Sequence, residues 1–392
     1  MIYHEFKGKQ LSLLGFGAMR LPTNTDGSVD EEQVREMTRY AIENGVNYFD
    51  TAYSYHNNDS EPIMGRVLRE YPRDSFYLAT KYPGHQLMSN GYNPAEIFEE
   101  QLRNCGVDYF DFYLLHNVYE KSMDVYLDPK WNIVGYFKEQ KRLGRIKHLG
   151  FSTHAQVEGL EQFLDLCGED MEFCQIQLNY LDWTLQDAKT KYELLTGRGI
   201  PVWVMEPVRG GKLSRLSEED ERKLKELRPD ESVSAWGFRF LQGLPNVGMI
   251  LSGMSNLAQM EDNVKTFSQA LPLHDQEREL VLEIAEGMKS SVPCTACRYC
   301  CNDCPMGLDI PLLLSIYNEI KVVPSVNAVM NIQFMEDNKK PAACIACGKC
   351  TKICPQNIDV PNILRDLSRR VEKIPSWADI CLEREEAARR HR

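Results

Sequence analysis

Eight cysteines near the end of this chain are arranged in two runs with the same spacing. The runs are Cys294-x2-Cys297-x2-Cys300-x3-Cys304 and Cys344-x2-Cys347-x2-Cys350-x3-Cys354, each followed by proline. Thiolate sulfur is the ligand that iron–sulfur clusters prefer, and short spacings allow three sulfurs from one loop to reach the same cubane. The spacing therefore predicts two [4Fe-4S] clusters.

The fourth cysteine of each run is expected to bind the cluster of the other run, as it does in two-cluster ferredoxins. One cluster is then held by Cys294, Cys297, Cys300 and Cys354, and the second by Cys344, Cys347, Cys350 and Cys304. The alternative is a pair of structural zinc sites, whose ligands usually come as separated CxxC pairs. Cys301 has no counterpart in the second run, where Thr351 stands, so we expect it not to be a ligand.

The segment between the two cysteine runs contains a stretch with helical apolar spacing around Ile310 and Pro311, with proline at a helix start. This connection is longer than the hairpin of a compact bacterial ferredoxin. The region from about residue 286 to 372 therefore resembles the α-helical ferredoxins of electron-transfer proteins. The charged tail after Glu383 is expected to form a solvated helix.

Eight short apolar runs alternate with helix-like segments over residues 1–285. These runs are 13–16, 47–50, 76–80, 112–115, 146–151, 173–176, 202–205 and 249–251. Eight strands with helices between them predict a (β/α)8 TIM barrel, and the stretch before residue 13 is expected to be a hairpin that plugs its bottom. We thus expect two domains, this α/β barrel over 1–285 and a small, mainly α-helical cluster domain over 286–392.

Polar residues stand where five of the predicted strands end. They are Asp50, Lys81, His116, Ser152 and Gln175. The loops at the C-terminal ends of the strands build the active site in barrels of this kind. One such residue could simply cap a helix, but five on successive strands indicate a catalytic site.

The segment from Asp50 to Tyr55, with the sequence DTAYSY, resembles the signature of the aldo/keto reductase family. Lys81, His116 and Ser152 follow in the family's order, and the whole chain is similar to the subgroup with a C-terminal ferredoxin module. The resemblance implies that Tyr55 is the general acid that protonates a carbonyl oxygen as hydride reaches its carbon. It also implies that Lys81, paired with Asp50, tunes Tyr55, and that His116 orients the carbonyl. Tyr53 is expected to be a packing residue.

The resemblance also implies a nicotinamide cofactor bound without a Rossmann fingerprint. Family correspondence puts Ser152 and Gln175 at the nicotinamide amide, Lys212 at the pyrophosphate, and Gln259 with Asn263 near the adenosine end. Near the expected 2′-phosphate position, the segment 253–256 and Gln259 lack the basic residues that commonly grip NADP. NADP(H) is the expected cofactor, with NAD(H) as the alternative.

The formal net charge of −12 and the lack of a dominant basic cluster argue against nucleic-acid binding. The opening residues do not resemble a secretory signal, and no window approaches 18 uninterrupted apolar residues. A cytoplasmic protein without a membrane span is therefore expected, and clustered thiols in such a protein indicate metal ligands rather than disulfides.

Together these features predict an oxidoreductase that transfers hydride between NAD(P)H and a carbonyl or alcohol substrate. Its two clusters would form an electron relay served by a redox partner such as ferredoxin. One alternative is reduction of a substrate by cluster electrons without any nicotinamide. Another is a non-catalytic barrel subunit, against which the intact Asp50, Tyr55, Lys81 and His116 argue.

Overall fold

The computed structural model describes residues 1–86, 93–120, 122–288, 292–322, 332–333 and 335–374. The chain folds into two compact units, Met1–Glu286 and Gly287–Arg392. The charged helix expected after Glu383 lies outside the described residues. Within the described ranges, no helix has both the length and the apolar character that crossing a membrane requires.

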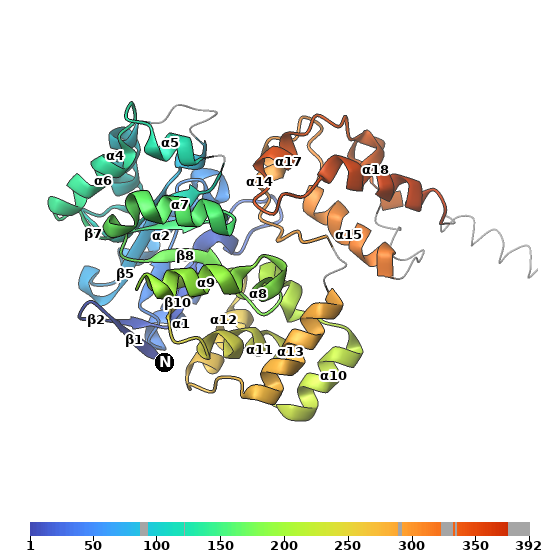
Figure 1. The fold of residues 1–392 in the computed structure, drawn as a ribbon, viewed down its shortest axis with the longest axis horizontal. Coiled ribbons are helices and arrows are strands. Elements are labelled where there is room, and N and C mark those ends of the chain that lie inside the picture. The colour runs from blue at the N-terminus through green and yellow to red at the C-terminus, as the bar shows by residue number, and fades with distance from the viewer. Residues whose placement is uncertain (87–92, 121, 289–291, 323–331, 334, 375–392) are drawn as a thin grey trace, which may run out of the picture. The chain divides into compact units, whose positions relative to one another are not determined.

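Eight parallel strands close into a barrel in the first unit (Figure 1). They are β3 (Leu14–Gly17), β4 (Tyr48–Asp50), β5 (Tyr77–Tyr82), β6 (Phe110–Val118), β7 (Ile146–Thr153), β8 (Cys174–Gln177), β9 (Val202–Met205) and β10 (Val247–Ser252). Each strand pairs with the next, and β10 pairs with β3 to close the ring. Every predicted apolar run overlaps one of these strands, so the predicted TIM barrel is confirmed.

Helices surround the strands on the outside of the barrel (Figure 1). They are α1 (Glu31–Glu43), α2 (Ser60–Leu68), α4 (Pro94–Cys105), α5 (Met123–Leu127), α6 (Ile133–Arg142), α7 (Val157–Cys167), α8 (Asp182–Leu185), α9 (Ala188–Gly197), α10 (Glu218–Leu227), α11 (Val233–Gln242), α12 (Leu257–Phe267) and α13 (Asp275–Met288). Several begin at a capping side chain, as where Asp30 accepts from the Gln33 amide at α1. Such a cap satisfies an amide that the helix itself leaves without a partner.

A hairpin of β1 (Tyr3–Phe6) and β2 (Lys9–Ser12) precedes the barrel, as the sequence predicted. Its Phe6 and Leu11 are buried in one cluster with Trp203 and Phe112 of the barrel strands. The Phe6 ring meets the Trp203 ring edge-on at 5.1 Å between centroids. Burying a side chain of this size contributes about 1.5–3 kcal/mol, so the hairpin is held to the barrel mainly by apolar contact.

An ionic cluster also ties this hairpin to the barrel. Glu172 accepts from the Lys7 amine over 2.7 Å and from His148 Nδ1 over 2.9 Å, and it pairs with Lys141. Burial raises the pKa of Glu172, but the hydrogen bonds from His148, Lys141 and Lys7 outweigh burial and leave the pKa well below its ordinary value. The carboxylate is therefore held ionised at the foot of the barrel.

The described part of the second unit is built mainly from helices. They are α14 (Tyr299–Asn302), α15 (Ile310–Val322), α17 (Lys349–Ile353) and α18 (Val360–Val371), with short 3-10 turns at Asp337–Lys339 and Pro341–Ala343. Leu313 and Leu314 of α15 are buried with Leu364 and Leu367 of α18 in a core of their own. This arrangement confirms the predicted small, mainly α-helical domain.

This second unit contains an internal sequence repeat. Equivalent positions of its two halves lie 50 residues apart, as Cys294 and Cys344 do. The sequence CPMGLDIP after the first run matches CPQNIDVP after the second. The backbone repeats as well, since Gly307 and Asn357 both have positive φ, at 57° and 51°. Glycine and asparagine tolerate this left-handed conformation better than other residues, which explains why these two types stand at the equivalent turns.

Candidate active site and cluster pockets

Asp50 and Lys81 are the buried centre of the barrel's candidate site. Asp50 is the last residue of β4, and Lys81 stands one residue before the end of the neighbouring strand β5. The Lys81 amine donates to Asp50 Oδ1 over 2.5 Å and to the Thr51 carbonyl over 2.8 Å. The strand ends therefore bring together two charges that are far apart in the sequence.

Tyr55 lies beside this pair, in the loop that follows β4. Its ring centre is 4.9 Å from the Lys81 amine. The ring meets that of His116, from β6, edge-on at 6.0 Å between centroids. Tyr53, in contrast, donates its hydroxyl to Glu100 over 3.2 Å. The structure thus groups Asp50, Tyr55, Lys81 and His116, while Tyr53 is engaged elsewhere.

The loop that carries Tyr55 turns sharply through three residues with positive φ. His56, Asn57 and Asn58 have φ values of 50°, 54° and 75°. Asparagine visits this region at modest cost, whereas histidine needs support from its surroundings. His56 has that support, because its Nε2 accepts from the Leu21 amide over 3.2 Å. A histidine at this position therefore fixes the turn that positions Tyr55.

Burial shapes the ionisation of the site. It raises the pKa of Asp50 and lowers the pKa of Lys81, and each opposite charge counteracts the effect on its neighbour. Burial also lowers the pKa of His116 well below its usual value, helped by His85 and by the Lys81 charge. At neutral pH the His116 ring is consequently uncharged, so that it can donate a hydrogen bond without carrying a positive charge.

Several buried polar atoms around this centre have no hydrogen-bond partner among the described residues. They are Asp50 Oδ2, His116 Nδ1, Ser152 Oγ and Gln175 Oε1. Ser152 and Gln175 are paired in register on the neighbouring strands β7 and β8. Gln175 is the second residue of β8 rather than at its end, because β8 continues to Gln177. Buried groups of this kind ordinarily have a partner, so their clustering indicates a binding site.

A second buried network supports the Lys81 strand and was missed by sequence reasoning. Glu61 of α2 accepts from Thr80 Oγ1 over 2.5 Å and from Gln101 Nε2 over 2.6 Å. Gln101 also donates to the Lys81 carbonyl over 3.0 Å, and Tyr113 donates to Gln101. Burial raises the pKa of Glu61 above its ordinary value, and the hydrogen bonds from Thr80 and Gln101 offset only part of that rise. The signal that could have found this network is the apolar setting of Glu61, between Ser60 and Pro62-Ile63-Met64.

The residues predicted to bind the rest of the cofactor lie after β9 and β10. Lys212 follows Gly210 and Gly211, whose φ values are 63° and 89°. Gln259 Oε1 accepts from the Ser255 amide over 2.8 Å. Asn263 is buried and donates to Ser252 over 2.9 Å. The side chains of Gln259 and Asn263 thus hold the loop between β10 and α12 in shape.

A buried ion pair under the Lys212 loop was also missed. Arg209 Nε donates to Asp182 Oδ2 over 3.0 Å, and both side chains are fully buried. The same carboxylate accepts from Gln177 and Asn179, each over 2.7 Å. No spacing in the sequence indicates this contact, because Asp182 begins α8 and Arg209 lies in the turn after β9.

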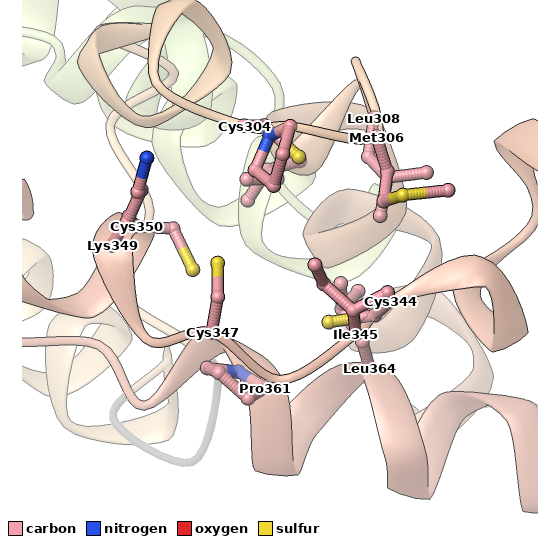
Figure 2. A pocket seen from close by; sticks show the side chains of 12 residues that line it. Cys304, Met306, Leu308, Cys344, Ile345, Cys347, Lys349, Cys350, Pro361 and Leu364 are labelled. Atoms are coloured by element: carbon pink, nitrogen blue, oxygen red, sulfur yellow. The ribbon is translucent and has the colours of Figure 1, made fainter.

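In the second unit, four cysteines line one pocket (Figure 2). They are Cys304, Cys344, Cys347 and Cys350. Figure 2 shows the sulfurs of Cys347 and Cys350 pointing toward one another, with apolar side chains such as Leu308 and Leu364 around the same space. One cysteine of the first run therefore joins three of the second.

Another pocket of this unit has the reverse composition, with three cysteines of the first run and one of the second. Its lining includes Cys294, Cys297, Cys300 and Cys354. Among the described cysteines, Cys301 lines neither pocket and packs partly buried against the helical core. The grouping is the one expected from the crossed pattern of two-cluster ferredoxins.

Comparisons with known proteins agree with this division. Residues 13–286 match the model of the aldo/keto reductase family, and residues 293–358 match that of the 4Fe-4S dicluster domain. An NADH-specific methylglyoxal reductase of Escherichia coli is 24% identical over 323 residues, which cover 71% of this chain and 96% of that protein. A probable aldo-keto reductase of Glycine max is 30% identical over 156 residues, 37% of this chain and 42% of the relative.

A solved structure shows the same barrel. The aldo-keto reductase of Bacillus halodurans in its holo form has a TM-score of 0.57 and 26% identity, with 71% of this chain and 93% of that chain covered. The match with the soybean protein spans less than half of that relative's length. The match to the Bacillus structure, in contrast, spans most of that chain, so the two proteins share the barrel fold along nearly the whole length of the Bacillus protein.

Proposed function

The chain belongs to the aldo/keto reductase family and carries a 4Fe-4S dicluster domain, and we propose that it reduces a small carbonyl substrate with NAD(P)H. The arrangement of Tyr55 between Lys81 and His116 is the observation that carries this proposal. The reverse reaction, oxidation of the corresponding alcohol, uses the same groups. The homologous methylglyoxal reductase of Escherichia coli takes its name from a small carbonyl compound, which supports this substrate class.

The proton is donated by Tyr55 in this proposal. A tyrosine hydroxyl ordinarily has a pKa of about 10, so it needs a stabilising charge to donate and recover a proton near neutrality. The Lys81 amine, 4.9 Å from the Tyr55 ring centre, supplies that charge. Asp50 holds Lys81 in place through its 2.5 Å hydrogen bond. Tyr55 thus protonates the carbonyl oxygen as its carbon becomes tetrahedral.

His116 orients the carbonyl. Its Nδ1 is buried without a partner among the described residues, and its low pKa keeps the ring uncharged at neutral pH. The His116 carbonyl accepts from His85 Nδ1 over 2.7 Å and also from the Tyr126 hydroxyl. Two hydrogen bonds on one backbone carbonyl fix the part of β6 that carries this ring. A ring fixed in this way can direct a substrate oxygen toward Tyr55.

Ser152 and Gln175 fit the carboxamide of a nicotinamide. The hydroxyl and the amide oxygen, which have no partner among the described residues, belong to residues in register on the neighbouring strands β7 and β8, and a carboxamide offers both a donor and an acceptor. Bound NAD(P)H would supply a hydride to the substrate carbon. We assign Lys212 to the pyrophosphate and Gln259 with Asn263 to the shape of the adenosine pocket.

The cysteine pockets hold the two [4Fe-4S] clusters in this proposal. Cys294, Cys297, Cys300 and Cys354 serve one, and Cys304, Cys344, Cys347 and Cys350 serve the other. A single zinc ion would need sulfurs that all lie at about 2.3 Å from it. The ligands here come instead as two runs of three closely spaced cysteines with a fourth before proline, and each set of four thiols lines a pocket of its own. Bound clusters would supply one-electron capacity.

Hydride transfer and cluster chemistry differ in the number of electrons that they move. A hydride carries two electrons in one step, whereas a cubane ordinarily exchanges one. We therefore propose that NAD(P)H alone leaves the clusters oxidised and that a separate one-electron carrier, such as ferredoxin, exchanges electrons with them. Electron paramagnetic resonance under anaerobic conditions distinguishes the two sources. Rapid reduction of the clusters by NADPH or NADH in flavin-free protein would contradict the separation.

The experiment that tests the reductase is a screen of small aldehydes and ketones with the iron-loaded protein under anaerobic conditions. We expect oxidation of NADPH or NADH in step with carbonyl loss, at a rate that depends on Tyr55. Fluorescence titration with each nucleotide measures binding separately from turnover. Absence of binding of both nucleotides, together with absence of carbonyl reduction, would refute the proposal.

A further inference from the structure

The two halves of the cluster domain differ in charge at equivalent positions. Where the first cysteine run has Tyr299, Asn302 and Asp303, the second has Lys349, Lys352 and Ile353. The second run contains no acidic residue from Cys344 to Ile358. The first run has one basic residue, Arg298, and it is paired with Asp309 over 3.1 Å. The formal charges therefore cancel across residues 294–304, which contain Arg298 and Asp303, whereas residues 344–354 carry two positive charges and no negative one.

The second run is also exposed where it lines its pocket. Ile345, directly after Cys344, has an exposed fraction of 60%, whereas its equivalent Thr295 has 4%. Cys347 is exposed too, and Lys349 is both exposed and part of the pocket lining. Figure 2 shows Lys349 next to Cys350 at the edge of this pocket. This edge of the pocket therefore combines an exposed apolar side chain with an exposed positive charge, as an interface with an apolar centre and a polar rim does.

We propose that Ile345, Lys349 and Lys352 form a docking surface for a small acidic one-electron carrier protein, which exchanges electrons with the cluster of Cys304, Cys344, Cys347 and Cys350. This inference rests on the proposed function, because it needs that cluster. In the reducing direction the carrier loses one electron and the oxidised cluster gains it, with no proton or bond change required. The apolar Ile345 supplies contact, and the lysines supply attraction.

Charge complementarity identifies the partner. Lysines on a surface steer a negatively charged protein into contact, which raises the association rate and makes it sensitive to salt. Electron-transfer complexes are small and transient, so a few charges and one apolar contact suffice for a functional encounter. The first run does not offer this combination, because Thr295 is buried and Asp303 adds negative charge.

The test measures how fast a reduced acidic ferredoxin reduces the clusters of the full-length, iron-loaded protein by stopped flow. Lys349→Glu combined with Lys352→Glu should slow the second-order rate at low salt by about tenfold or more, since charge reversal turns attraction into repulsion. Asn302→Glu is the matched control in the first repeat. We expect the second-order rate of this variant to remain within about twofold of the parent rate. The parent rate should fall as salt rises from about 50 mM to about 500 mM.

Two further measurements separate the possible failures. Iron content and the resonance signal after dithionite reduction show whether the clusters are present, independently of docking. A parent protein without clusters would overturn the cluster assignment and this inference together. If the clusters are intact but are reduced equally fast in the parent and in the lysine variant, the proposed docking surface is wrong and the cluster assignment stands. If the charge reversal lowers iron content, Lys349→Gln with Lys352→Gln takes its place, with an expected slowing of about threefold.

Discussion

The Lys81 amine lies 2.5 Å from Asp50 Oδ1, and both side chains are almost completely withdrawn from solvent. Removing one partner of a buried ion pair leaves an uncompensated charge and costs about 3–5 kcal/mol. We therefore expect Lys81→Met and Asp50→Asn each to destabilise the barrel, and the double variant to recover much of the loss without recovering activity. Urea unfolding followed by circular dichroism measures the first effect, and carbonyl reduction measures the second. A double variant with near-parental turnover would exclude the pair from catalysis.

Replacement of Tyr55 by phenylalanine removes the proposed acid and leaves the ring in place. Carbonyl reduction should fall by about a hundredfold or more, which is the usual contribution of general acid catalysis. Nucleotide affinity and iron content should barely change. Tyr53→Phe is the matched control, because the Tyr53 hydroxyl donates to Glu100. The opposite pattern, with loss in Tyr53→Phe only, would show that the acid had been misassigned.

Cysteine substitutions test the crossed ligation. The parent protein should contain about eight iron and eight acid-labile sulfide per chain, as two cubanes require. Cys297→Ser or Cys354→Ser should remove about half of the iron and affect the same cluster, even though the two residues belong to different runs. Cys301→Ser should leave the iron content unchanged. Metal analysis and low-temperature resonance spectra measure these effects, and stoichiometric zinc without visible absorbance would rule out the clusters.

Glu172 should make barrel stability dependent on acid pH. Its folded pKa is lowered, because hydrogen bonds from His148, Lys141 and Lys7 outweigh burial. A lowered folded pKa means that the stabilisation is complete above the unfolded value, about 4.3, and is lost as pH falls toward the lower folded value. Glu172→Gln should therefore cost about 1–3 kcal/mol near pH 7 and less below about pH 4. Melting curves of the parent and of Glu172→Gln across this pH range measure the loss of stability. A stability difference that does not change with pH would contradict the lowered pKa of Glu172.

Much of the barrel could be predicted because its strands are short apolar runs separated by amphipathic helices. The predicted run 202–205 coincides with β9. The predicted run 112–115 is shorter than β6, which extends to Val118, because His116 and Asn117 are polar residues within a buried strand. For the same reason, Gln175 was predicted to lie at a strand end, whereas it lies inside β8, which continues to the polar residue Gln177. Polar residues inside functional strands thus hide the true ends of those strands.

The supporting networks could not be predicted, because they join residues that only the fold brings together. Glu61, Thr80 and Gln101 belong to a helix, a strand and another helix, and their contact depends on how those elements pack. Asp182 and Arg209 likewise meet only when the loops after β8 and β9 are in place. The cysteines differ, since equal spacing in two runs identifies the ligands before any packing is known.

The internal repeat of the cluster domain also bears on how the protein is made. In the proposed ligation, Cys294, Cys297 and Cys300 need a fourth thiolate from Cys354, one full repeat later in the chain. The first cluster site therefore stays incomplete on the ribosome until Cys354 has emerged. Iron delivery to either site is accordingly completed only after the second cysteine run has been synthesised.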